Sequence, residues 1–299
     1  MEYQPLTQAN IEKVYKLFNI NEPFYYIPFD YFKRGTLEDE DFDPELTLVL
    51  DDPQADYPRA ALIAVNRNNN CFIKACLVDK AFRRQGIGNN MMKELIKRAK
   101  NKNISLMSYG DAIPNYWQPG VDLRHTDLLF FLKKNRFKHQ ETRFNLTVHL
   151  SNLKIEPLSE KKGYYFERVQ PKDFENVCIF AKKNYPLHPF WAEEVKISLK
   201  IKPPTTFVAK NSIGEIIGWA THSLGIPGVF GPTGVIYRLQ GQGIGGELLK
   251  WCLWDIKQNG FDICEILYVT GKTIKFYSKT VGAYIHPVFY TMHKKLKKS

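Results

Sequence analysis

The chain has 299 residues and a net charge of +11, with 44% hydrophobic and 24% charged residues. This length exceeds one ordinary hydrophobic core and predicts two domains, and the composition is that of a folded protein rather than a disordered one. No apolar run reaches the roughly 18 residues that a membrane span needs, and the first residues carry no signal-peptide pattern, so we expect a soluble cytoplasmic protein.

The basic surplus and the cysteines limit the kinds of partner. Lys and Arg number 42 against 31 Asp and Glu, which indicates either a solvated basic surface or attraction to an anion such as a polyphosphate cofactor. The chain has no arginine-rich arm and no recognisable RNA-binding motif, so we do not expect nucleic acid to be a partner. The five cysteines are scattered without a C-x-x-C pair, which argues against a disulfide framework and predicts no metal site.

The predicted elements repeat along the chain. Residues 4–18 are typical of a short strand, a polar cap and an amphipathic helix. Residues 78–99 run from an apolar strand through a glycine loop into a second helix, and residues 128–137 are typical of a third helix. The same three features return in the same order at 167–181, 235–256 and 274–283. The sequence therefore predicts a duplicated domain, with copies at 1–152 and 163–299 separated by the polar stretch 151–163.

The order of elements within a copy predicts an α/β fold. In the second copy, "TTFVAKN" and "EIIGWATHSL" flank "SIG", which indicates a β-hairpin, and "FDICEILYV" is a strand that follows the loop helix. Antiparallel strands come first and a βαβ-like unit closes the copy. We expect a mixed, mostly antiparallel sheet flanked by helices in each copy.

Glycine-rich loops precede both middle helices, in "RRQGIGNNMM" and "QGQGIGGELL". Neither contains the lysine and hydroxyl pair of a nucleoside-triphosphate loop. Gly241, Gly243 and Gly246 match the dinucleotide pattern G-x-G-x-x-G, and a nicotinamide dehydrogenase remains a lower-ranked alternative. The first copy has Arg84 and Asn89 in place of the first and third of these glycines, which weakens that reading.

The pattern that both loops share, [R/Q]-x-x-G-x-G after a strand and before a helix, resembles the pyrophosphate loop of the GNAT family of N-acetyltransferases. The resemblance covers both copies and implies that backbone amides at a helix N-terminus bind the diphosphate of acetyl-CoA. It also implies that the main chain of the strand before the loop contacts the cofactor. The cofactor-binding residues expected from the resemblance are Arg83, Arg84, Gln85, Gly86, Ile87 and Gly88 in the first copy, and Val235, Tyr237, Gln240, Gly241, Gln242, Gly243, Ile244, Gly245 and Gly246 in the second.

The resemblance also suggests which copy is catalytic. Family members carry a tyrosine on the last helix that lies near the coenzyme A sulfur, and Tyr277 matches it, with one extra residue before Gly282. The first copy has Phe131 at the matching position, so we expect it to be catalytically degenerate. Glu265 and His222 are candidates for the general base, although a strand histidine is more often a hydrogen-bonded core residue and a strand glutamate more often part of a solvated face.

The acceptor is the least determined part of the prediction. In the family the segment after the first helix covers the acceptor site, and here 21–32, 114–122 and 185–195 are rich in aromatic residues and proline. Flat rings can stack on sugars or cations, and Glu193 or Glu194 could attract an ammonium group. We expect a small-molecule amine such as an amino sugar or aminoglycoside-like compound. A polyamine, a protein amine and a non-catalytic acyl-CoA-binding scaffold remain open, as does the oligomeric state.

Overall fold

The structure, a computed structural model, describes residues 1–113 and 115–296. The chain forms two compact units, as the duplication predicts: unit 1 comprises Met1–Arg143 with Pro287–Ser299, and unit 2 comprises Phe144–His286. These boundaries differ from the predicted 1–152 and 163–299, because the end of the chain belongs to unit 1. Pro114 of the aromatic loop 114–122 and the last three residues of the basic tail lie outside the described residues.

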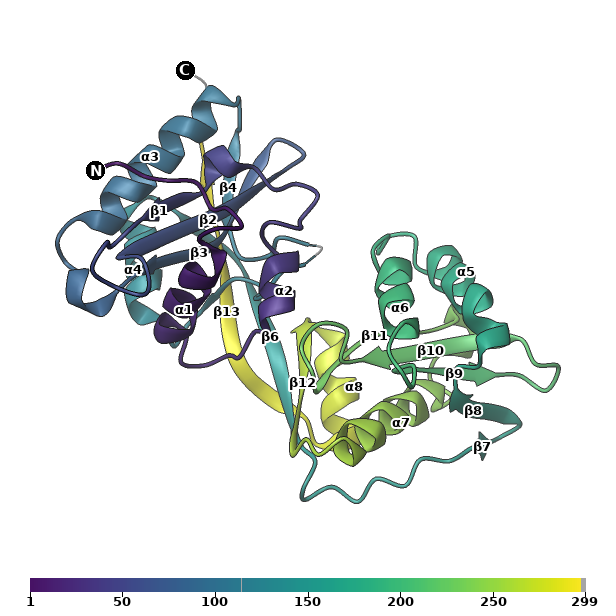
Figure 1. The fold of residues 1–299 in the computed structure, drawn as a ribbon. Helices are drawn as coiled ribbons and strands as arrows, with labels where there is room; N and C mark the ends of the chain where they lie inside the picture. The colour runs from purple at the N-terminus through teal and green to yellow at the C-terminus, as the bar shows by residue number, and fades with distance from the viewer. Residues whose placement is uncertain (114, 297–299) are drawn as a thin grey trace. The chain divides into compact units, whose positions relative to one another are not determined.

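Unit 1 is a mixed sheet with helices on both faces (Figure 1). Its strands run in the order β1-β2-β3-β4-β13, with β3 and β4 parallel and the other neighbours antiparallel. The elements are α1 (Ile11–Asn21), α2 (Phe29–Arg34), β1 (Leu48–Leu50), β2 (Ala60–Arg67), β3 (Asn70–Val78), α3 (Ile87–Asn101), β4 (Leu106–Tyr109), β5 (Val121–Asp122), α4 (Thr126–Lys134), the first half of β6 (Lys138–His149) and most of β13 (Tyr284–Lys295).

Unit 2 repeats this plan. Its sheet runs β7-β8-β9-β10-β11-β12-β6, with β11 and β12 parallel, and β9 and β10 form the predicted hairpin. The elements are β7 (Glu160–Lys161), β8 (Tyr164–Arg168), α5 (Phe174–Asn184), α6 (Trp191–Leu199), β9 (Thr206–Lys210), β10 (Ile216–His222), β11 (Val229–Val235), α7 (Ile244–Gln258), β12 (Ile263–Val269) and α8 (Lys272–Val281).

Each unit has two hydrophobic cores, one on each face of its sheet. Successive strand residues alternate between faces, so Leu62 packs toward α3 and α4 while Ile63 packs toward α1 and α2. In unit 2, α5 and α6 cover one face around Trp219, and α7 and α8 cover the other around Leu248 and Tyr277 (Figure 1). This double coverage explains why the middle strands are apolar at nearly every position.

The last strand of each copy is exchanged between the units. The part of β6 from Phe144 onward pairs with β12 of unit 2, with Leu146 opposite Ile266. The part of β13 from Pro287 onward pairs with β4 of unit 1, with Met292 opposite Tyr109. Leu146 and Met292 are completely buried. Each sheet is therefore completed by a strand from the other copy.

Exchange of strands predicts that the first copy does not fold alone. A chain ending at residue 150 lacks the buried side chains of Phe289 and Met292 and leaves β4 with an open edge. We expect it to show no cooperative thermal unfolding by circular dichroism. A matched chain that joins residues 1–143 through a short glycine linker to 287–299 is expected to unfold in one transition. Equal cooperativity of the two chains would contradict the exchange.

The described residues contain neither a membrane-spanning helix nor a metal cluster, and the cysteines are unpaired. No helix among residues 1–113 and 115–296 is long and apolar enough to cross a membrane. Within the same residues, no group of three or more His, Cys, Asp or Glu side chains is arranged to hold a metal ion. The five cysteines are all free thiols, and Cys71, Cys252 and Cys264 are buried.

Candidate cofactor loops and catalytic site

The two glycine loops have the same backbone conformation. Arg84 and Gly241, which are equivalent, have φ angles of 65° and 82°, and Gly86 and Gly243 have φ angles of 84° and 87°. Each of these last two glycines is the N-cap of a helix, α3 or α7. Two left-handed residues spaced by one position turn the chain sharply from strand to helix. Because Arg84 adopts this left-handed conformation without being glycine, the loop does not require the first glycine of the dinucleotide pattern.

The loops present unpaired backbone amides. Among the residues that the structure describes, no hydrogen-bond acceptor is found for the backbone N–H groups of 84–89 or 241–246. A Cβ atom built at Gly86 or Gly241 would have no heavy atom within 4 Å, so the backbone is open to approach. Amides at a helix N-terminus favour an anion through both hydrogen bonding and the helix dipole. The loops therefore fit the diphosphate of coenzyme A.

The parallel strands separate beside each loop. Pairing of β3 with β4 ends at Ile73 and Tyr109, although β3 continues to Val78. Pairing of β11 with β12 ends at Phe230 and Ile266, although β11 continues to Val235. The unpaired length of each strand leaves backbone groups facing the opening between the strands. An extended ligand that enters past the loop can bind to this edge.

Arg83 and Gln240 bind the chain itself. Arg83 Nε donates to the carbonyl of Val78 at 3.0 Å, and Gln240 Nε2 donates to the carbonyl of Val235 at 3.2 Å. Arg83 also bonds to Asp127 of α4 and to Asn21 at the end of α1, at 3.0 and 2.7 Å. These side chains fix the end of the strand that leads into the loop. Whether they also contact a cofactor, as the resemblance implies, stays a prediction.

The hairpin of β7 and β8 places the Lys161 ammonium group beside the glycine loop of unit 2. Lys161 Nζ lies 3.5 Å from the position that a Gly243 Cβ would take and 2.7 Å from the Glu247 carboxylate. Glu247 is buried in the first turn of α7; burial raises the pKa of its carboxyl, but Lys161 and Lys250 outweigh burial and lower it. Tyr164 Oη donates to Gln242 Oε1 at 2.7 Å, which docks the hairpin on the loop. No local sequence pattern marks Lys161 as part of the site, because it lies in the polar stretch 151–163 between the two copies.

The contacts of α4 with α3 and of α8 with α7 show which residues of α4 and α8 are equivalent. A Cβ at Gly88 would lie 3.3 Å from the Phe131 ring, and a Cβ at Gly245 would lie 3.6 Å from the Phe276 ring. Phe131 is therefore equivalent to Phe276, and the next residue, Leu132, is equivalent to Tyr277. The alignment of Phe131 with Tyr277 made from the sequence is wrong by one residue, because α8 is one residue longer before its terminal glycine. A leucine side chain, like that of phenylalanine, has no ionisable group and cannot act as a general acid.

Tyr277 lies where β11 and β12 begin to separate. Its ring packs edge-on against Phe230, the last paired residue of β11, with centroids 5.9 Å apart. The side chain is 8% exposed, and no described residue makes a hydrogen bond to its hydroxyl group. Burial raises the pKa of Tyr277, so the phenol stays protonated at neutral pH. This position is compatible with a proton donor at the base of the opening.

His222 is part of a buried ion network away from the loop. Its Nε2 lies 3.0 Å from Asp255, its Nδ1 lies 2.9 Å from Ser223 Oγ, and Asp255 also binds Arg168. Asp255 is eleven residues into α7, about 16 Å along the helix from Ile244. Burial raises the pKa of Asp255, but hydrogen bonds from His222 and Arg168 outweigh it and lower the value to about 2. The structure does not bring His222 to the loop, and both ring nitrogens are engaged.

This network predicts a large effect on stability. Removing one partner of a buried ion pair leaves an uncompensated charge, so we expect Asp255→Ala to lower the free energy of unfolding by about 3–5 kcal/mol. Since folding lowers the pKa of Asp255, its contribution is fully present above about pH 4 and is lost as the pH falls toward 2. Urea unfolding at several pH values tests both statements, with exposed Asp262→Ala as the control. Equal stability of the two variants at pH 7 would refute this account.

Glu265 lies at the separation point on the opposite face. It pairs in register with Val229, and its neighbours Cys264 and Ile266 belong to the core beneath α7 and α8. Alternation along β12 therefore directs the half-buried Glu265 side chain toward the α5–α6 face. The structure thus brings Tyr277 and Glu265 to the same point of the sheet, on opposite faces.

The predicted acceptor segments differ between the units. In unit 1, Trp117 is buried and stacks on Phe32 with ring centroids 4.8 Å apart. Lys74, on β3 just past its last pair with β4, is buried with Asp39 at 3.1 Å. The α1–α2 face of unit 1 is therefore filled by its own side chains. In unit 2 the aromatic residues of 185–195 gather around the start of α6.

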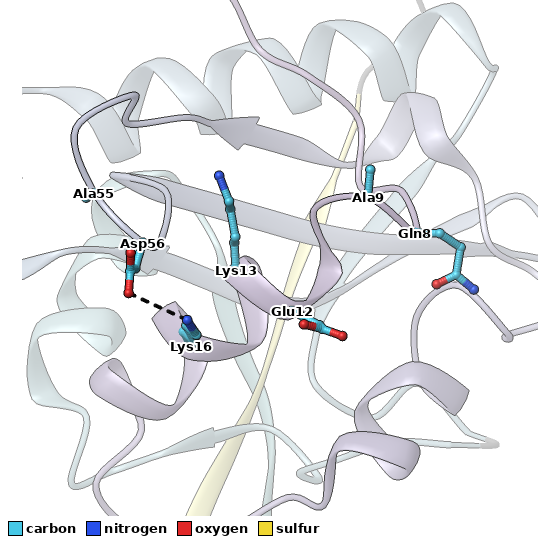
Figure 2. A pocket seen from close by; sticks show the side chains of 7 residues that line it. All are labelled: Gln8, Ala9, Glu12, Lys13, Lys16, Ala55 and Asp56. Carbon is cyan, nitrogen blue, oxygen red and sulfur yellow. Dashed lines mark ion pairs between the residues drawn. The ribbon is translucent and has the colours of Figure 1, made fainter.

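A separate hollow lies on the outer surface of unit 1. Figure 2 shows it beside the first turns of α1, with Lys16 and Asp56 paired at 3.7 Å across one end. Its volume is 440 Å³. It shares no residue with the loop, which meets α1 at the other end through Asn21. The lining residues are Gln8, Ala9, Glu12, Lys13, Lys16, Ala55 and Asp56.

Comparison with known proteins agrees with this geometry. A family model described as the acetyltransferase (GNAT) family matches residues 12–115, which cover most of unit 1 up to the end of its loop helix and β4. No protein with a curated description matches the sequence. The match ends before α4, so it does not include the position of Leu132.

Solved structures show the same tandem fold along the whole chain. A tandem GNAT protein from the clavulanic acid biosynthesis pathway is 15% identical, with a TM-score of 0.72, and the similarity covers 100% of this chain and 99% of that one. A GCN5-related N-acetyltransferase from Sphaerobacter thermophilus is 14% identical, with a TM-score of 0.70, covering 98% and 95%. A fungal multi-domain GH3 β-N-acetylglucosaminidase with a GCN5-related glucosamine N-acetyltransferase region is 16% identical, with a TM-score of 0.74. The similarity covers 98% of this chain but only 38% of the fungal protein's chain. The chain therefore has the tandem fold of these GNAT structures, and part of unit 1 matches the GNAT family model.

Proposed function

We propose that the chain is an acetyl-CoA-dependent N-acetyltransferase and that unit 2 transfers the acetyl group to a primary amine. The observation that carries this proposal is the loop before α7, with unpaired amides at a helix N-terminus beside two separating strands. Residues 240–246 would hold the diphosphate, and the unpaired edge of β11 that ends at Val235 would face the thioester. A backbone N–H there stabilises the oxygen that becomes negative during transfer.

Tyr277 supplies the proton for the departing thiolate in this proposal. Its ring packs against Phe230, where the pairing of β11 with β12 ends, and burial keeps the phenol protonated. Glu265 remains a candidate for binding or deprotonating the amine from the other face. The engaged nitrogens of His222 favour a structural role for that residue.

For unit 1 we propose cofactor binding without transfer. The loop before α3 has the same open conformation as that of unit 2, but Leu132 replaces the tyrosine and buried Lys74 and Trp117 fill the acceptor face. Acetyl-CoA bound there would stabilise the fold without being consumed.

An amino sugar is the acceptor that we propose to test first. Aromatic side chains near the start of α6 suit the flat face of a sugar, and one protein of the same fold is described as having a glucosamine N-acetyltransferase region. The chain would be incubated with acetyl-CoA and glucosamine, spermidine or a lysine peptide, and free thiol would be measured. Acetyl-CoA binding without thiol release for any amine would favour the alternative, a non-catalytic acyl-CoA-binding protein. Titration calorimetry would show whether one unit or both bind.

A further inference from the structure

Side chains in unit 1 join two helices that lie on opposite faces of its sheet. Helix α1 packs with Ile63 on one face, and α4 packs with Leu62 on the other. Glu22 is the residue after α1, and His125 is the residue before α4. The two carboxylate oxygens of Glu22 lie 2.9 and 3.1 Å from His125 Nε2, and both side chains are largely buried.

A second link between the same helices runs through the cofactor loop. The Arg83 guanidinium group donates to Asn21 Oδ1 at 2.7 Å and to Asp127 Oδ2 at 3.0 Å. The ring of Phe24 meets the His125 ring edge-on, with centroids 4.9 Å apart. The two links together form what we call the α1–α4 bridge, which consists of Asn21, Glu22, Arg83, His125 and Asp127.

The bridge lies where β3 and β4 have separated. Arg83 Nε donates to the carbonyl of Val78, the last residue of β3, whereas the pairing of β3 with β4 ends at Ile73. Burial raises the pKa of Tyr109, the last paired residue of β4, and the nearby carboxylates of the bridge raise it further. Side chains that connect the two faces at this point span the opening between the strands.

Unit 2 has no equivalent bridge. Tyr185, the residue after α5, donates to the carbonyl of Val235 at the end of β11. Throughout the described part of unit 2, no hydrogen bond or ion pair joins residues 184–191 to residues 270–283. The two openings therefore differ, although the loops beside them have the same backbone conformation.

We propose that the α1–α4 bridge is an autoinhibitory latch, which must open before the pantetheine arm of acetyl-CoA enters the opening of unit 1. This inference rests on the proposed function and concerns the unit that binds the cofactor without transfer. When a binding-competent state is only partly populated, the apparent affinity falls in proportion to its population. Unit 1 therefore binds acetyl-CoA more weakly than its loop alone would allow.

His125 makes the latch sensitive to pH. Burial lowers the pKa of its imidazole, but Glu22 outweighs burial, with smaller effects of Asp122 and Asp127, and the pKa is raised. The ion pair is thus complete below the ordinary pKa of about 6.5 and is lost as the pH rises through the folded value. Of the groups on the neighbouring elements, only the imidazole changes its charge between about pH 6 and pH 8. The other charged or titratable groups there are Glu22, Cys76, Arg83, Tyr109, Asp122, Arg124 and Asp127.

The test uses a chain with Gly241→Asp, which places a negative charge at the loop of unit 2 and leaves unit 1 as the site that calorimetry reports. In this chain, Glu22→Ala is expected to tighten coenzyme A binding about tenfold, as for a latch that is open about one tenth of the time. Adenosine 3′,5′-bisphosphate, which lacks the pantetheine arm, should bind as before. Glu45→Ala removes an ion pair with Lys102 at the far end of α3 and should change neither affinity.

The pH profile gives an independent measurement. The Gly241→Asp chain should bind coenzyme A more tightly at pH 8 than at pH 6, by a factor that Glu22→Ala removes. Asp127→Asn changes an exposed side chain that the fold can spare, so it serves if Glu22→Ala does not fold. We expect this second variant to tighten coenzyme A binding about threefold, because it releases only one of the two links.

The sign of the effect separates a latch from a contact that only supports the fold. Loss of a supporting contact weakens binding or leaves it unchanged, so either result in a natively folded variant would overturn the inference. Equal gains for coenzyme A and the bisphosphate would also overturn it, because the change would then act through charge at the loop. These failures leave thiol release by unit 2 intact. A wild-type chain that binds no acetyl-CoA and releases no thiol would contradict the proposed function as well.

Discussion

Replacement of Tyr277 by phenylalanine is expected to lower kcat for acetyl transfer by about 100- to 10,000-fold, the contribution of a well-placed general acid. Phenylalanine keeps the edge-on contact with Phe230, and the hydroxyl group makes no hydrogen bond to a described residue, so the fold should tolerate the change. KM and acetyl-CoA affinity should remain near the wild-type values, since only proton transfer to the leaving thiolate is removed. Steady-state thiol release and calorimetry measure these quantities.

A matched control comes from Tyr284, an exposed tyrosine that bonds to His149. Tyr284→Phe should leave kcat unchanged. Leu132 provides a second comparison, because it occupies the equivalent position in unit 1 and is already without a hydroxyl group. If Tyr277→Phe turned over as fast as wild type, another group would have to protonate the thiolate, and the assignment of unit 2 as the catalytic unit would lose its main chemical argument.

The second large effect is expected at the cofactor loop. Gly241→Asp adds a negative charge where the diphosphate would bind, and we expect it to weaken acetyl-CoA binding to unit 2 by about 100-fold. Two unit charges 4 Å apart at an effective dielectric constant of 20 interact by about 4 kcal/mol, so the estimate allows for partial screening. The new side chain has room, because nothing lies within 4 Å of the position of its Cβ.

Gly241→Asn is the control for shape and backbone strain. Asparagine is nearly isosteric with aspartate and tolerates left-handed φ angles, and Arg84 already adopts φ of 65° at the equivalent position of unit 1. We expect Gly241→Asn to bind acetyl-CoA almost as wild type does. The difference between the two variants should shrink in high salt. Equal affinities of the Asp and Asn variants would mean that no phosphate lies near Gly241.

Local sequence was sufficient to predict the loops. Left-handed backbone next to a helix start is encoded by adjacent residues, and Gly86 and Gly243 stand where the shared pattern places them. The comparison of the two copies was equally informative, because Arg84 in place of Gly241 separated this loop from the dinucleotide pattern. Helix α7 and strand β12 follow the loop in the predicted order.

The chemistry outside the loops depended on contacts between distant segments. The sequence proposed His222 as a base, but its ring binds Asp255, 33 residues away. Lys161 reaches Glu247 across 86 residues, and no local pattern marks either pair. The equivalence of Leu132 and Tyr277 became visible only when Phe131 and Phe276 were seen to pack on matching glycines.

The sequence by itself determined the duplication, the order of strands and helices in each copy and the two loops, because these follow from side-chain periodicity and from glycine within a few residues. Only the tertiary structure decided which strand completes which sheet, since the partners of β6 and β13 lie more than 100 residues away in sequence and no local pattern specifies them. It likewise decided that Glu194 is half-buried while Glu193 is exposed and pairs with Lys196, because burial depends on what the fold packs around a helix face.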